Sequence, residues 1–145
     1  MELFVSTYRA KIDSNLRASV PAAFRACCPE LLVFAYCSLT HGCITVCTPS
    51  KMQEMCAYIE SLDAFSTKRE AMETIILGGS EQLHIDAKGR ITLSERLIEF
   101  AGIGTDIAFV GKGRTFEIWS VDKLAIHIAK AREHVLSQKF TWEGN

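Results

Sequence analysis

The sequence predicts an α+β protein in which one strand–turn–strand–helix unit occurs twice. The first observation is a repeated phrase, "DSNLR" at 13–17 and "DAKGR" at 86–90, whose aspartates lie 73 positions apart. The second is that "CITV" at 43–46 aligns with "FEIW" at 116–119 at the same spacing, with no gap between. The third is that each copy alternates apolar and polar residues, as strands do, before a helical pattern begins.

Each copy is expected to begin with a tight β-hairpin followed by a short helix. In the second copy, "QLHID" at 82–86 and "RITL" at 90–93 alternate as strands do, and the loop between them ends in Gly89. Such a loop is a favoured hairpin connection, because glycine adopts the left-handed conformation without steric cost. Ser94 is the expected N-cap of the helix that follows, and Gly102 is its expected end.

A second hairpin is expected further along each copy. In the second copy, residues 106–120 read as two strands that turn at Gly111–Gly113. In the first copy, "LLVFAYC" at 31–37 and "CITVC" at 43–47 form the equivalent pair across Leu39–Gly42.

Amphipathic helices complete the chain. We divide it into a first unit at 1–50, connecting helices at 51–78, and a second unit at 79–145 that ends in a helix at about 122–138. The apolar stripe of that last helix contains Leu124, Ile128, Ala131 and Val135. Such stripes are most simply contacts with the core or with other subunits, and the alternative is a groove that binds a partner protein.

Composition limits the choice of function. A chain of 145 residues, 48% hydrophobic and 23% charged, is typical of one globular domain or of two very small ones. No apolar run is long enough to span a bilayer and no secretion signal begins the chain, so we expect a cytosolic protein without a membrane partner. Sixteen basic against seventeen acidic residues give a net charge of −1, so nucleic-acid binding would require basic side chains gathered on one face.

All six cysteines lie in the first half of the chain. There is no C-x-x-C pair, so a structural zinc site is poorly supported, and cytosolic thiols stay reduced. We expect the cysteines to pack as small apolar residues, and the protein to need no metal and no cofactor. A minor alternative is a metal ion bound by His41, Cys43 and Cys47.

The repeated phrase has two interpretations. In a hairpin, Asp86 and Arg90 face each other, so one interpretation is an ion pair that closes the turn and contributes about 0–1 kcal/mol. The other is a DNA-binding loop, in which Lys88 and Arg90 project as two cations and Asp86 holds Arg90 in position.

The first copy offers a similar set of cations. Asp13 and Arg17 stand at the two ends of its turn, Lys11 flanks that turn, and Arg9 precedes Lys11 on the same strand face. A two-stranded ribbon that carries such cations fits the major groove of DNA.

An enzyme would need further groups near the Asp–Arg pair. No nucleophile motif accompanies it, and "GKGR" at 111–114 lacks the frame of a phosphate-binding loop and reads as a turn. An enzyme that uses an Asp–Arg pair with a distant cysteine is the weakest alternative, so we expect no catalysis and no small-molecule substrate.

Three segments carry a resemblance to a known family. In this order, "ILGGSE" at 76–81, "HIDAKGRITLSERLIEFAGI" at 84–103 and "FEIWS" at 116–120 closely resemble the second half of MraZ proteins. These are bacterial transcriptional regulators of the division and cell-wall gene cluster. The resemblance implies an AbrB-like (SpoVT-AbrB) fold, in which tandem strand–loop–strand–helix units form a small β-barrel-like core with flanking helices.

The resemblance also implies a partner and a site. It implies a ring-shaped homo-oligomer that presents many loops to short direct repeats in double-stranded promoter DNA, at the nucleoid of the cytoplasm. Carried over to this chain, the D-x-x-x-R loops nominate as DNA contacts Asp13, Arg17, Asp86, Lys88, Gly89 and Arg90.

The first loop departs from the family pattern. Asn15 and Leu16 stand where Lys-Gly is usual, so the cation at the tip is lost, and we expect Asn15 to adopt the left-handed conformation in place of glycine. The second loop is therefore the stronger candidate for DNA contact. The main alternative for the whole chain is a non-catalytic scaffold whose amphipathic helices recruit a partner protein without specific DNA binding.

Overall fold

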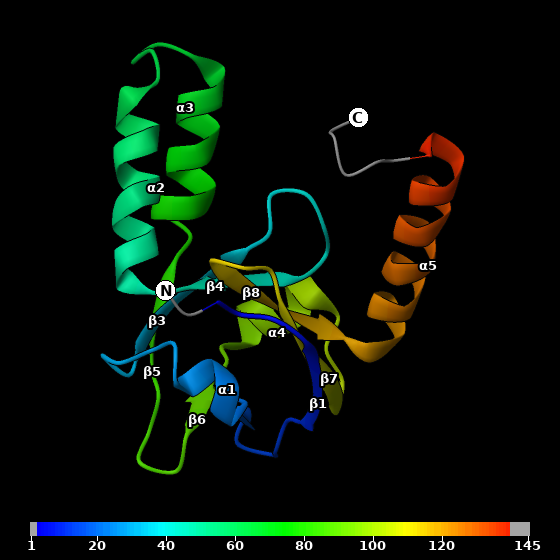
Figure 1. The fold of residues 1–145 in the computed structure, drawn as a ribbon. Helices are drawn as coiled ribbons and strands as arrows, with labels where there is room; N and C mark the ends of the chain where they lie inside the picture. Colours follow the sequence, from blue (N-terminus) through cyan, green and yellow to red (C-terminus); the bar gives the residue numbers. More distant parts are fainter. Residues whose placement is uncertain (1–2, 140–145) are drawn as a thin grey trace.

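The fold comes from a computed structural model, which describes residues 3–139 of the chain. Its strands and helices follow the predicted order, with the connecting helices between the two copies (Figure 1). The strands are β1 (Thr7–Lys11), β2 (Arg17–Ser19), β3 (Leu32–Cys37), β4 (Ile44–Cys47), β5 (Glu81–His84), β6 (Arg90–Thr92), β7 (Asp106–Gly111) and β8 (Thr115–Ser120). The helices are α1 (Ala22–Arg25), α2 (Pro49–Ser61), α3 (Thr67–Met72), the π-helical turn η1 (Glu73–Leu77), α4 (Glu95–Ala101) and α5 (Val121–Gln138).

Six of the strands form one antiparallel sheet in the order β1-β7-β8-β4-β3-β5. The β3–β4 and β7–β8 hairpins are both present, which confirms the prediction for these two segments. At the centre of the sheet β4 pairs with β8, so that Ile44 faces Ile118 and Thr45 faces Glu117. The repeat aligns Ile44 with Glu117 and Thr45 with Ile118, so the two pairs occupy equivalent positions of the two copies.

The strands β2 and β6 form a separate two-stranded ladder, in which Arg17 faces Thr92 and Ser19 faces Arg90. The prediction of a tight hairpin at the start of each copy is therefore wrong, because β1 pairs with β7 and β5 pairs with β3. The alternating pattern specifies which side chains face the core, but it leaves the partner strand open.

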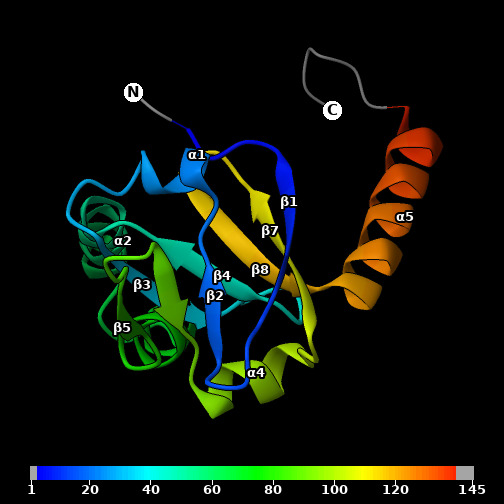
Figure 2. The same ribbon diagram turned by 90° about the horizontal axis from the view of Figure 1, so that it is seen from below.

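The sheet is not a closed barrel. Its edges are β1 and β5, and among the strands that the structure describes no ladder joins them. The barrel-like core that the resemblance implied is therefore corrected to an open sheet with β2 and β6 laid against it. Figure 2 shows this arrangement from below.

The main core lies between the sheet and the β2–β6 ladder. Phe24 of α1 is 1% exposed, and its ring centroid lies 5.0 Å from that of Phe116 and 5.3 Å from that of Phe4. Leu97 of α4, which the repeat aligns with Phe24, is fully buried in the same cluster. Each short helix is therefore anchored by a buried apolar side chain at the same position of the repeat.

Helix α4 begins and ends where the sequence predicts. Ser94 Oγ accepts a hydrogen bond from the amide of Leu97 at 3.2 Å, and Gly102 ends the helix with φ of 62°. Both assignments depend on neighbours within a single turn, which is why the sequence alone was sufficient.

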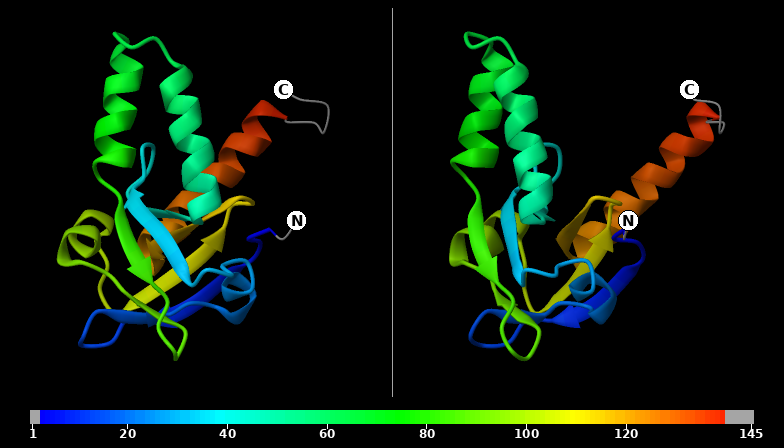
Figure 3. Two further views of the ribbon diagram at one scale, coloured as in Figure 1. Left: turned by 90° about the vertical axis from the view of Figure 1, so that its left-hand side faces the viewer. Right: turned by 60° about the vertical axis from the view of Figure 1, so that its left-hand side comes forward.

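The remaining helices extend from the body as two arms (Figures 1 and 3). The arm formed by α2, α3 and η1 is held to the sheet by Ile59 of α2 and Ile76 of η1, which are buried in a small cluster with Tyr36 and Cys47.

The first turns of α5 hold it to the body: Leu124 is buried, Val121 packs against the same cluster, and His127 stacks on Trp119 with ring centroids 4.6 Å apart. Further along its stripe, Ile128 and Val135 are 49% and 47% exposed. Most of the α5 stripe is thus not a core contact within one chain. Across residues 3–139, no helix is both long and apolar enough to span a membrane.

Candidate nucleic-acid interface

The two D-x-x-x-R loops lie at one end of the molecule. Residues 13–17 connect β1 to β2, and residues 86–90 connect β5 to β6. Both loops project at the end opposite the α2–α3 pair (Figures 1 and 3). The fold therefore brings together two segments that are far apart in the sequence.

A single aspartate organises the second loop. The Oδ1 atom of Asp86 accepts hydrogen bonds from the amides of Lys88 and Arg90, both at 2.9 Å. Its Oδ2 atom accepts from Nε of Arg90 at 3.1 Å. The backbone closes the loop, since the amide of Asp86 donates to the carbonyl of Arg90 and the amide of Gly89 donates to the carbonyl of Asp86.

The first loop repeats these contacts. The Oδ1 atom of Asp13 accepts from the amides of Asn15 and Arg17 at 2.8 and 2.9 Å, and its Oδ2 atom accepts from Nε of Arg17 at 3.0 Å. The backbone bonds also match, with the amide of Leu16 in the place of the glycine amide. The aspartate and the arginine thus impose one loop shape on two different tip sequences.

The left-handed position of each loop carries a different residue. In the second loop it is Gly89, with φ of 78°, and in the first it is Leu16, with φ of 63°. The prediction that Asn15 adopts this conformation is wrong. The hydrogen bonds that close the loop put its fourth residue in the left-handed conformation, and in this loop the fourth residue is Leu16. A non-glycine residue in this region is strained, and Leu16 offsets part of that cost by packing its side chain against the main core.

Each loop arginine keeps its terminal nitrogens available. Within residues 3–139, the side chains of Arg17 and Arg90 hydrogen-bond only through Nε, to their own aspartates. Their side chains are 33% and 25% exposed, so they are held in place but still accessible. A guanidinium fixed in this way presents a fork of N–H donors that matches a phosphate or the O6/N7 edge of guanine.

The loop contacts lower the pKa of both aspartates. The largest cause is the hydrogen bond from the amide of Arg17 to Asp13 and from the amide of Arg90 to Asp86. Because the pKa is lowered on folding, the charged form that accepts these bonds is present at neutral pH and is lost only as the pH falls through the lowered pKa. The loop geometry is therefore expected to be constant near neutral pH.

We expect NMR titration to place the pKa of Asp86 below its usual 3.8, and to keep it below 3.8 in an Arg90→Ala variant. The backbone amide at position 90, which is the largest cause, survives this substitution. An Asp86 pKa that returned fully to 3.8 in the variant would show that the side-chain ion pair dominates instead. Asp13 in the same variant serves as the internal control.

The other predicted cations lie in different surroundings. Lys88 is exposed at the tip of the second loop. Lys11 pairs with Asp106 of β7 at 2.8 Å, and Arg9 is exposed on the same edge strand, close enough to contribute to lowering the pKa of Asp106. Lys11 and Arg9 therefore belong to the β1–β7 edge and not to a loop tip.

A residue that the sequence pattern did not nominate covers the second loop. A Cβ atom added to Gly89 would lie 2.9 Å from Nη1 and 3.0 Å from Cδ of Arg25, which belongs to α1. Arg25 also donates from Nη1 to the carbonyl of Val20. The repeat aligns Arg25 with Ile98, so the sequence repeat did not indicate a second cation at this position. The helix α1 lies over this loop because β2, which precedes it, pairs with β6 of the second copy.

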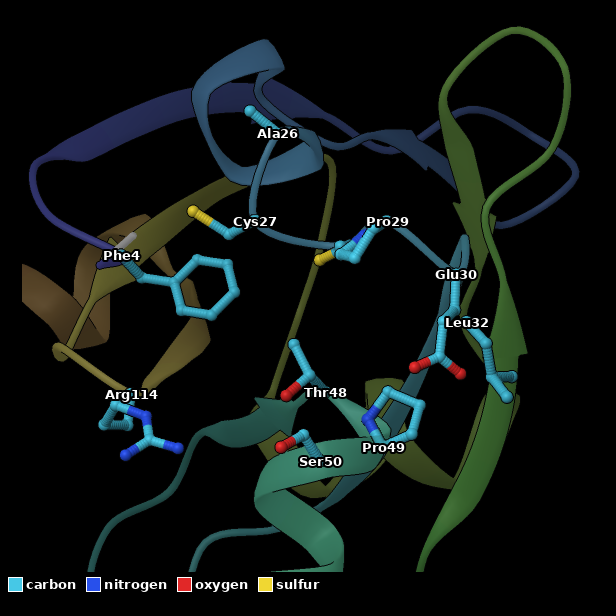
Figure 4. A pocket seen from close by; sticks show the side chains of 11 residues that line it. Phe4, Ala26, Cys27, Pro29, Glu30, Leu32, Thr48, Pro49, Ser50 and Arg114 are labelled. Carbon is cyan, nitrogen blue, oxygen red and sulfur yellow. The ribbon is translucent and has the colours of Figure 1, made fainter. Parts of the chain in front are cut away.

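Cys27 and Cys28 line a cavity in another part of the fold. The cavity, of about 460 Å³, opens between Cys27 and the start of α2, and Arg114 stands at its side (Figure 4). Neither D-x-x-x-R loop lines it, so it does not unite an Asp–Arg pair with a cysteine. Burial raises the pKa of the adjacent Cys28 thiol to about 11, which leaves that thiol protonated and a poor nucleophile at neutral pH.

The three residues considered for a metal do not converge. Cys43 is buried beneath Trp119, Cys47 is buried in the separate cluster under α2, and the ring of His41 lies 4.4 Å from that of His127. In the described part of the chain, no group of three or more His, Cys, Asp or Glu side chains is arranged to hold a metal ion. The burial of both thiols fits their interpretation as small apolar residues.

Comparison with known proteins gives a consistent result. Residues 76–141 match the family described as "MraZ protein, putative antitoxin-like". Over 144 residues the chain is 39% identical to the transcriptional regulator MraZ of Rickettsia akari (strain Hartford) and 38% identical to that of Rickettsia canadensis (strain McKiel). It is 37% identical to that of Rickettsia bellii (strain OSU 85-389), and all three comparisons cover 97% of both chains. The chain therefore belongs to the MraZ family.

Proposed function

We propose that this protein is a transcriptional regulator that binds double-stranded promoter DNA containing short direct repeats. The observation that carries the proposal is the pair of loops at one end of the molecule, each holding an arginine with its terminal nitrogens available. The Rickettsia relatives, which are named as transcriptional regulators, support it. On this proposal the protein acts at the nucleoid in the cytoplasm, without catalysis, cofactor or small-molecule substrate.

We also propose that residues 1–50 and 79–145 are tandem AbrB-like (SpoVT-AbrB) units joined by residues 51–78. The matched hydrogen bonds of the two loops support this, as does the pairing of β2 with β6. The proposal explains why one loop architecture occurs twice in the chain although the tips differ.

A ring-shaped homo-oligomer completes the proposal. The outer part of α5 exposes apolar side chains that residues 3–139 do not cover, among them Ile126 at 58% and Leu136 at 70%. Contact between copies would bury them. A ring also makes individually weak loops effective, because neighbouring loops engage neighbouring repeats at a high effective concentration. The net charge of −1 is compatible with this, since the cations need to gather only on one face.

The test is binding to a labelled fragment of the DNA upstream of the protein's own gene, measured by fluorescence anisotropy and by footprinting at two salt concentrations. We expect protection of repeated short sequences, and a Kd that rises with salt with a log–log slope of about 0.9 for each phosphate contact. A fragment of the same composition in shuffled order is the control. Equal binding to both fragments, or none to either, would contradict the proposal.

The second candidate function is a protein-interaction scaffold. The observation that favours it is Phe65, which is 96% exposed at the far end of the α2–α3 pair. A scaffold would capture its partner protein through the helical arms and would be indifferent to substitutions at Arg17 and Arg90. A DNA-binding regulator, by contrast, would lose affinity for DNA when Arg17 or Arg90 is replaced.

A further inference from the structure

We propose that Arg25 of α1 is a phosphate contact of the second DNA-binding loop, so that this loop uses a cation from the first half of the chain. This inference rests on the proposed DNA-binding function. It adds a residue that lies outside both D-x-x-x-R phrases, and it makes the second loop a composite of the two units.

The position of Arg25 is fixed by the backbone of the ladder. Its Nη1 atom donates to the carbonyl of Val20, and the amide of Val20 donates to the carbonyl of Gly89 at 2.9 Å. The guanidinium is therefore held by the residue that is itself bonded to the loop. A cation placed in this way loses little further side-chain freedom when it meets an anion.

Arg25 has no anionic partner within residues 3–139. Five other arginines in that range form ion pairs with carboxylates, namely Arg17, Arg69, Arg90, Arg96 and Arg114. Arg25 is half-buried instead, and among the described residues its side chain makes one hydrogen bond, which leaves other N–H donors of the guanidinium available. Two further cations, Lys88 and Arg90, belong to the same loop. Positive charges that lie close together repel one another, and an anion bound between them removes that repulsion. A DNA phosphate is such an anion.

Gly89 suits this loop by its backbone conformation and leaves space that Arg25 occupies. Its φ of 78° favours glycine, and a Cβ atom at this position would also meet three atoms of Arg25 at 2.9 to 3.0 Å. The first loop has the same left-handed position but neither the glycine nor the arginine, because Leu16 occupies the glycine position with φ of 63° and Ile98 occupies the position equivalent to Arg25. Both side chains pack against the main core. The second loop therefore differs from the first by Gly89 at the left-handed position and by Arg25 on the adjacent helix, as well as by the lysine at its tip.

The experiment measures the affinity of the full-length Arg25→Met variant for the upstream DNA fragment over a range of salt concentrations. Methionine keeps an unbranched apolar stem and removes only the charge and its donors. We expect weaker binding and a log–log salt slope that is smaller by about 0.9 for each engaged loop. Arg25→Lys keeps the charge and should keep the parental slope. Lys68→Met, which removes one charge on the distant α3, should leave both affinity and slope unchanged.

A purely structural role for Arg25 would lower the stability or the affinity but leave the salt slope of the bound protein unchanged, and that result would overturn the inference. If Arg25→Met does not fold, Arg25→Gln gives the same test, because its amide can still donate to Val20. Failure of the parent protein to bind the fragment at any salt concentration would remove the proposed function itself. Loss of binding in Arg90→Ala, together with a parental slope in Arg25→Met, would remove only this inference.

Discussion

Replacing Arg90 with alanine is expected to weaken binding to the upstream DNA by about 5- to 150-fold for each engaged loop, because a bidentate arginine contact is worth about 1–3 kcal/mol. The loss should multiply when neighbouring subunits bind together, since each subunit carries the same substitution. The fold should persist, because Asp86 keeps its backbone hydrogen bonds to the loop. Fluorescence anisotropy titration at fixed salt measures the loss, and size-exclusion chromatography with light scattering checks the oligomer.

The matched comparison is Arg17→Ala in the first loop. Its arginine has the same geometry, but Asn15 and Leu16 replace the Lys-Gly tip, so this loop offers one cation where the second offers two. We therefore expect Arg17→Ala to cost less affinity than Arg90→Ala. Lys68→Ala on α3 controls for the loss of one positive charge. Parental binding by both arginine variants would show that the loops do not contact DNA.

Replacing Phe24 with alanine is expected to destabilise the protein by about 3–5 kcal/mol, as large-to-small changes of a buried phenylalanine do. The ring of Phe24 is 1% exposed and meets those of Phe4, Tyr8, Phe109 and Phe116, with centroids 5.0 to 6.5 Å away. For a chain of this size the midpoint of thermal unfolding should fall by roughly 2–4 °C for each kcal/mol. The loss should also loosen α1, and with it the position of Arg25 above the second loop.

The control for this prediction is the same substitution at an exposed position. Phe65→Ala removes a ring that is 96% exposed, so it should change the free energy of unfolding by no more than about 0.5 kcal/mol. Urea unfolding followed by circular dichroism, at one protomer concentration for all variants, gives both values. Similar losses for the two phenylalanines would contradict the core described here.

Local features of the fold were predictable from the sequence. The helix α4 has the predicted cap at Ser94 and the predicted stop at Gly102, and the turn at Gly111–Gly113 joins two strands as expected. In the candidate site, the pairing of Asp86 with Arg90 was also predicted. All of these depend on residues no more than a few positions apart. A side chain and the backbone it caps or bonds are brought together by the chain itself.

Features that depend on distant segments were not predictable in the same way. The β2–β6 ladder, which pairs a strand of the first copy with a strand of the second, replaces the expected hairpins. Arg25 was missed because nothing in its neighbourhood in the sequence points to Gly89. A stripe such as that of α5 shows where apolar side chains gather on a helix, but not whether the same chain covers them.

By itself the sequence determined the order of the elements, the caps and turns, the aspartate–arginine pair of each loop and the family to which the chain belongs. The tertiary structure alone decided which strands pair, which faces stay uncovered and which cation lies over the second loop. The physical reason is that local hydrogen bonds are set by spacing along the chain. The choice among strand partners, by contrast, depends on burying one shared core, to which residues from both halves contribute.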